Sequence, residues 1–150
     1  MSAGPYVMVI DWLPLTPANR WYKGHWSKTA TLVTEWKGAA IIAAQLAKLP
    51  KGVGSFRLTV QARHRTNHLT DFDAFAPAAK AICDGLVTGP KGGGYGLAAD
   101  DTPDIALGLT LLPSYLDRLK PDALIVQVVI EDQSPPPVRI TEDETNGPVS

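Results

Sequence analysis

The sequence predicts a small α/β (α+β) domain, in which a mixed sheet of about four strands packs with two main helices. Three observations support this fold class. The chain has 150 residues, which is the usual size of one domain with its own core. Hydrophobic residues make up 45% and charged residues 19%, as in globular proteins. The apolar residues recur at strand-like and helix-like spacings, in the order β, α, β, α, β, β.

The first two expected elements are a strand and a helix. Residues 6–11 (YVMVID) are mostly apolar and rich in β-branched side chains, which favours a strand. Residues 19–28 are polar, aromatic and basic, so we expect a loop there. Residues 30–48 carry apolar side chains at helical spacing, and Ser27 or Thr29 would cap this helix.

A second strand and a second helix follow. Residues 56–65 alternate between apolar and polar, so one face of this strand is buried and the other, which includes Arg63, is polar and partly basic. The second helix runs from about Asp73 to Leu86, with an apolar stripe along one side. Pro77 then lies in the first turn, where its missing N–H does little harm, or the helix begins at Pro77 itself.

The C-terminal part of the chain supplies the remaining strands. Residues 105–112 and 124–130 are expected to be strands, joined by a short helical turn over residues 114–120. The glycine-rich residues 89–96 form a loop. We assign residues 1–131 to one domain, and we expect the acidic, proline-rich residues 132–150 to be a disordered tail.

Cellular setting is predicted from what the sequence contains. One cysteine excludes an internal disulfide framework and favours a reducing, cytoplasmic setting. The N-terminus has no basic region of the kind that opens a signal peptide, and no apolar run approaches the length of a membrane span. We therefore expect no membrane partner.

Charge is distributed unevenly, although the net charge is only −1. Residues 12–70 contain nine Lys and Arg against one acid, Glu35, whereas residues 71–104 contain six Asp against two Lys. Such an asymmetry fits a polyanion partner beside a cation site. The alternative is that folding disperses both sets over the surface.

The strongest chemical signal is a series of carboxylates around one lysine. A helix that begins at Asp73 would place Asp73, Lys80 and Asp84 on one face, away from the apolar stripe. The glycine-rich loop could fold Asp100 and Asp101 back onto that face. Carboxylates this close need a proton, a basic partner or a metal, and an all-oxygen set suits Mg²⁺ or Mn²⁺. The alternative is that Asp73 caps the helix and the later pair is solvated in a turn.

Two other patterns are weaker. His25, His64, His68 and Cys83 are residue types that bind zinc, but no paired-cysteine motif accompanies them, and ordinary loop histidines are favoured. The glycine-rich loop lacks the Gly-Lys-Ser/Thr of a phosphate-binding loop.

Several motifs follow one another in a fixed order along the chain: Pro14-Leu-Thr-Pro17-Ala-Asn19-Arg20-Trp21-Tyr22, Asp71-Phe72-Asp73-Ala74, Lys80, Asp84-Gly85-Leu86 and Asp100-Asp101. In this order they resemble the motifs of the RusA family of Holliday junction resolvases, which occurs in phages and prophages. The resemblance covers roughly residues 6–131. The sequence departs from the family where Ala74 stands in place of an Asn and where about three extra residues, including Pro77, precede Lys80.

The resemblance implies a homodimeric, Mg²⁺-dependent endonuclease, with Mn²⁺ as a substitute, that cuts two opposed strands of a four-way DNA junction. It implies that Asp71, Asp73 and Asp101 are catalytic and bind the metal, with Asp100 as a further metal ligand. Lys80 would neutralise charge on the phosphate or assist the leaving group.

A basic and partly aromatic set of residues would bind the DNA arms through their phosphates. The set is Asn19, Arg20, Tyr22, Lys23, Lys28, Arg63 and Arg65. Anchoring of the loop by its Trp and Tyr side chains is the alternative for residues 19–28. Two other functions stay open: a protein that binds branched DNA with weak or lost cleavage, and an α/β domain whose acids bind a structural cation.

Overall fold

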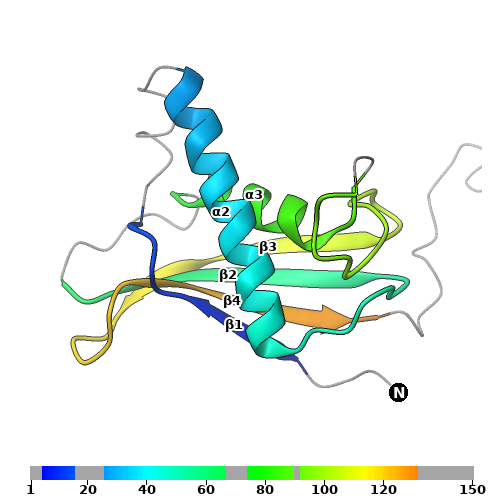
Figure 1. Cartoon of the computed structure of the whole chain (residues 1–150). Helices are drawn as coiled ribbons and strands as arrows, with labels where there is room; N and C mark the ends of the chain where they lie inside the picture. The colour runs from blue at the N-terminus through cyan, green and yellow to red at the C-terminus, as the bar shows by residue number, and fades with distance from the viewer. Residues whose placement is uncertain (1–4, 16–25, 67–73, 90–91, 132–150) are drawn as a thin grey trace, which may run out of the picture.

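The computed structural model describes residues 5–15, 26–66, 74–89 and 92–131 (Figure 1). Within them, four strands form one mixed sheet and two helices pack on it, which confirms the expected fold class. Neither helix of this part of the chain is long and apolar enough to cross a membrane. The expected tail, residues 132–150, lies outside the described residues.

The sheet has the strand order β1-β4-β2-β3. Its strands are β1 (Tyr6–Ile10), β2 (Phe56–His64), β3 (Ala106–Leu116) and β4 (Ala123–Ile130). Strand β4 is antiparallel to both of its neighbours, whereas β2 and β3 are parallel. A parallel pair needs a long crossover, and the second helix lies in that connection.

Both helices cover the same face of the sheet (Figure 1). They are α2 (Trp26–Ala47) and α3 (Ala76–Leu86). They approach closely at Gly85, where a Cβ atom would lie 2.6 Å from the carbonyl oxygen of Lys37. A side chain at this position would force the helices apart, so Gly85 fixes where α3 crosses α2.

The core lies between the helices and the sheet. Alternate strand residues point into it, as the period of two requires. Its largest fully buried side chains include Trp36, Phe56, Met8, Ile10, Leu58, Ile82, Leu86, Leu97, Leu124, Val126 and Val128. The opposite face of the sheet, which we call the open face, carries no helix of the described residues.

Helix α2 begins earlier than predicted, whereas α3 begins one residue before the alternative start at Pro77. Helix α2 begins at Trp26 rather than near residue 30, so Ser27 and Thr29 lie inside it rather than at its N-cap position. No Gly or Pro lies between Trp26 and Lys37, so the sequence allows the helix to begin at Trp26. Helix α3 begins at Ala76, after a turn.

The later start of α3 follows from Pro77. A proline ring inside a helix clashes with the carbonyl four residues earlier, which here is Asp73. Proline is well placed at the second helical position, as observed. The helix does not begin at Asp73, so the condition for placing Asp73 on the helical face of Lys80 is not met, and Asp73 itself lies outside the described residues. Lys80 and Asp84 do share a face.

Strand β3 is longer than expected. It continues through Leu116, so the helical turn predicted over residues 114–120 is wrong for its first three residues. The strand tolerates Pro113 because a register shift beside β2, between Gln61 and Arg63, absorbs an extra residue there. Pairing with β2 then resumes, and it outweighs the preference of residues 114–116 for a helical turn.

Candidate functional site

The site is built where the loop after α3 folds back onto the end of that helix. Carbonyl oxygens near a helix end have no partner within the helix. Here Gly85 O accepts from Tyr95 N at 2.8 Å, and Leu86 O accepts from Gly96 N at 3.0 Å. A further bond joins Thr88 N to Ala98 O at 2.9 Å. The glycine-rich loop thus runs beside α3 and delivers the two acids that follow it.

Gly94 is the residue that permits this fold-back. A Cβ atom there would lie 1.5 Å from the carbonyl oxygen of Val87, which is a severe overlap with rigid backbone. The neighbouring Gly93 has open space around the same position. Of these adjacent glycines, Gly94 is therefore the one that the loop requires.

Lys80 joins the two chain segments of the site. Its Nζ donates to Asp101 Oδ2 at 2.6 Å and to Asp84 Oδ1 at 3.1 Å. The predicted proximity of Lys80 and the later acids is confirmed for Asp101. The hydrogen bond to Asp101 raises the pKa of Lys80 well above its ordinary value. The same bond holds the pKa of the Asp101 carboxyl below its usual range.

These shifts decide which proton transfers the cluster can perform near neutral pH. Lys80 is fully protonated, so it can donate hydrogen bonds or neutralise charge but cannot act as a base. Asp101 is ionised, so it can bind a cation but has no proton to donate. Near neutral pH the cluster therefore supplies fixed charges and does not act as an acid–base pair.

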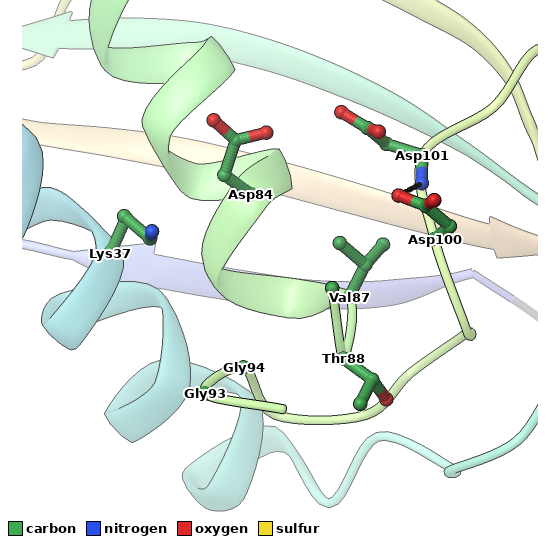
Figure 2. Close-up of a pocket in the computed structure, with 9 residues that line it drawn as sticks. Lys37, Asp84, Val87, Thr88, Gly93, Gly94, Asp100 and Asp101 are labelled. Atoms are coloured by element: carbon green, nitrogen blue, oxygen red, sulfur yellow. Dashed lines mark hydrogen bonds between the residues drawn. The ribbon is translucent and has the colours of Figure 1, made fainter. Parts of the chain in front are cut away.

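A pocket of about 390 Å³ opens beside this cluster (Figure 2). Asp84, Asp100 and Asp101 line one side, and Lys37 of α2 lines another. Asp100 Oδ1 accepts the backbone N–H of Asp101 at 2.8 Å, drawn as a dashed line in Figure 2. The remaining lining residues are Val87, Thr88, Gly89, Gly93 and Gly94.

Lys37 is the cation of this pocket that makes no ion pair within the described residues. Its side chain is exposed, and its nitrogen is directed toward α3 in Figure 2. It reaches the pocket because α2 crosses α3 beside Gly85. It therefore offers a charged donor to any anion that approaches the acids.

The described residues include carboxylates of the kind that the predicted cation site needs. Asp84 and Asp101 provide hard carboxylate oxygens, the donor type that Mg²⁺ prefers, around a position now held by the ammonium of Lys80. No group of three or more His, Cys, Asp or Glu among the described residues is arranged to hold a metal. Asp71 and Asp73, the other two expected ligands, lie outside the described residues.

The expected DNA-binding residues divide into three groups. Asn19, Arg20, Tyr22 and Lys23 lie outside the described residues, and Lys28 lies in α2 but its side chain is not described. Arg65 is exposed. Arg63 is only 6% exposed, and its Nε donates to Pro121 O at 2.9 Å, so the prediction that it lies on a polar face is wrong.

The zinc alternative gains no support from the two described residues among its four candidates. His64 is buried, with its ring 6.0 Å from that of Phe75. Cys83 is buried in the core, and burial raises the pKa of its thiol to about 11, which disfavours the thiolate that binds metals.

The sequence predicts Asp84 beside Lys80 but gives it no catalytic or metal-binding role, and it does not predict Lys37 and Thr88 as residues of the site. Asp84 has a clear sequence signal, because it lies four residues after Lys80 and such pairs meet on a helix. Lys37 and Thr88 have no local signal. Their positions depend on the crossing at Gly85 and on the path of the loop.

No protein-family model matches this chain, and no curated protein matches it either. The resemblance of its motifs to the RusA family therefore stays a prediction, and the case for function depends on the chemistry of the site.

Proposed function

We propose that this protein is a Mg²⁺-dependent endodeoxyribonuclease that resolves four-way DNA junctions as a homodimer. The observation that carries the proposal is that Lys80 is held between Asp84 and Asp101, two acids that line one pocket. Nucleases that hydrolyse phosphodiesters need carboxylates for a cation and a fixed positive charge for the phosphate.

Each residue then has a distinct role. Asp101, ionised at neutral pH, would hold the metal together with Asp71, Asp73 and Asp100. When bound, Mg²⁺ would activate water and stabilise the charge that develops on the phosphorus oxygens. Lys80 would bind a phosphate oxygen or the leaving oxygen, because it keeps its proton throughout the working pH range.

Lys37 would contact a phosphate of the same strand beside the one that is cut. Lys37 lines the pocket beside Asp84, Asp100 and Asp101. It makes no ion pair within the described residues, so no such ion pair has to break when it binds a phosphate. DNA of any sequence presents phosphates at regular spacing, so such contacts position the strand without selecting its bases.

A second candidate is a protein that binds branched DNA but cuts it weakly or not at all. Ala74 favours it, since the family that the motifs resemble carries Asn at this position. The late start of α3 at Ala76 also favours it, because the sequence between Asp73 and Lys80 does not form one continuous helical face.

One paired assay separates these functions. A synthetic four-way junction is incubated with the full chain in Mg²⁺ to measure nicking, and in Ca²⁺ to measure binding. The proposal expects paired nicks in Mg²⁺ and tight binding in Ca²⁺. Binding without nicks supports the second candidate, and the absence of both rejects both DNA functions.

A further inference from the structure

A second pocket, which we call the interhelix pocket, is lined by both helices and lies beside the candidate site. Its volume is about 380 Å³, which is within the range of sites that bind small organic groups. The lining residues are Thr29 and Val33 of α2 and Ala76, Pro77, Lys80, Ala81 and Asp84 of α3. Asp84 also lines the pocket that contains Asp100 and Asp101, so the two pockets are neighbours.

Helical spacing and the crossing of the helices explain why this pocket forms. Thr29 and Val33 are four residues apart on α2, so they lie on one face, which also carries Lys37. The backbone of Lys37 lies against Gly85 of α3. All residues of the interhelix pocket precede this contact on their own helix, so the pocket occupies one side of the crossing.

The chemistry of the interhelix pocket differs from that of its neighbour. Val33 and Pro77 are half-buried and Ala81 is buried, so much of the wall is aliphatic. The charged residues of its lining are Lys80 and Asp84, which pair with each other. An aliphatic surface therefore begins next to the lysine that the proposed function places on a phosphate.

We propose that the interhelix pocket binds a nucleobase that has left its stack, from a nucleotide next to the phosphate at Lys80. The inference rests on the proposed function. One sugar joins a base to its phosphate, so a phosphate bound by Lys80 brings a base within reach of the walls that Lys80 helps to form. A base has two apolar faces and a polar edge. The aliphatic walls suit the faces, and the Thr29 hydroxyl and the Asp84 carboxylate suit the edge.

Such a pocket would contribute to selectivity for branched DNA. Taking a base out of a regular duplex gives up its pairing and stacking, and the loss is smallest for a base that is already poorly paired or stacked. Strands exchange partners at the branch point of a four-way junction, which interrupts the stack there. A base at the branch point therefore enters the pocket at a lower cost than a base within an arm.

The test uses the full chain and a synthetic four-way junction in Ca²⁺, so that binding is measured without cleavage. Adenines near the branch point are replaced one at a time by 2-aminopurine, a base analogue whose fluorescence rises when it leaves the stack. We expect the parent protein to raise the fluorescence at one or two adjacent branch-point positions and at none within the arms.

Two variants fill the pocket from opposite walls. Val33→Phe does so from α2 and Ala76→Leu from α3. Each should abolish the fluorescence rise and weaken junction binding about 5-fold, the low end of what one stacked base contributes, because these walls are aliphatic. Leu46→Phe introduces the same ring on α2 at a residue that is 73% exposed, and this control should behave like the parent.

An abasic site gives a second readout that does not depend on fluorescence. Removing the base at the position that brightens should weaken binding to the parent protein about 5-fold. The same abasic site should leave the affinity of Val33→Phe unchanged, because the two changes remove one and the same contact. Additive losses would mean that the base binds elsewhere and would contradict the inference.

Three further results would overturn the base pocket. Junction binding with no fluorescence rise at any branch-point position, or a rise that both filling variants keep, would reject it and leave the proposed function intact. A Tm lowered by several degrees in both filling variants without DNA, with Leu46→Phe unchanged, would show that the protein itself already fills the pocket. A parent chain that binds no junction would reject the proposed function and this inference together.

Discussion

At the scale of single residues, the site depends on one lysine that two chain segments share. Lys80 on α3 contacts Asp84 one turn later and Asp101 beyond the glycine-rich loop. The lysine therefore links the helix to the loop as well as fixing the charge of the site. Removing it affects stability and chemistry by separate routes, and the two can be measured separately.

The stability effect of Lys80 should depend on pH. Because the pKa of Asp101 is lowered from 3.8, its contribution is present above that value and is lost as pH falls through the lower folded pKa. Because the pKa of Lys80 is raised from 10.5, its contribution is present below that value and is lost as pH rises through the higher folded pKa.

Thermal melting of the parent and of Lys80→Met checks this dependence. The lysine is largely exposed, so the ion pair should contribute only about 0.2–1 kcal/mol. The difference in Tm should be constant between about pH 5 and 9 and should shrink at both extremes. A difference that peaks at low pH would show that Asp101 is not the partner.

Lys37 tests whether the pocket binds a phosphate. Lys37→Met should weaken junction binding in Ca²⁺ about 3- to 10-fold and should lower the slope of log affinity against log salt by about 0.9, as expected for one lost phosphate contact. Lys48→Met removes the same charge just beyond the C-terminal end of α2, away from the pocket, and serves as the control. Equal losses in the two variants would mean that Lys37 acts only through net charge.

At the scale of elements, the path of the loop after α3 decides whether a site forms. The sequence indicates a loop at residues 89–96, and its glycines favour a fold-back, which the structure confirms. It could not indicate which glycine matters, since that depends on the carbonyl of Val87 lying against Gly94. Lys37 was missed for a similar reason, because a helix crossing is set by tertiary packing.

Gly94→Ala and Gly93→Ala form a matched pair for this element. A methyl group at Gly94 overlaps backbone, which has to shift, so we expect a loss of about 1–3 kcal/mol in unfolding free energy. Gly93→Ala meets nothing and should change stability by less than about 0.5 kcal/mol. Chemical denaturation measures both, and equal effects would contradict the described loop path.

Arg63 is a residue whose burial the sequence does not predict. Its alternation with apolar residues in β2 predicts a polar face, yet both Arg63 and His64 are buried. The pairing of β2 with β4 stays regular through Arg63, but the turn before β4 supplies Pro121 O to the guanidinium, and the register with β3 shifts beside it. Alternation predicts burial only while the ladder is regular and no loop covers the strand.

At the scale of the whole molecule, the two helices cover one face of the sheet and leave the other face without a helix of the described residues (Figure 1). The candidate site lies on the covered side, and β3 lies at one edge of the sheet. The fold class was predictable because the order and period of the elements specify it. Strand order was not, since it depends on pairings between segments far apart in sequence.

The central claim is metal-dependent cleavage at the acids around Lys80, and Asp101→Asn tests it most directly. Asp104→Asn removes the same charge three residues later, where the carboxylate accepts a hydrogen bond from Thr102 Oγ1 at 2.6 Å, and is the control. The measurement is the rate of junction nicking in saturating Mg²⁺, with junction affinity in Ca²⁺ measured alongside. We predict that Asp101→Asn lowers the rate at least about 100-fold, or about 2.7 kcal/mol, and keeps its affinity, whereas Asp104→Asn cuts like the parent. Nicking by Asp101→Asn within a few-fold of the parent would contradict the account.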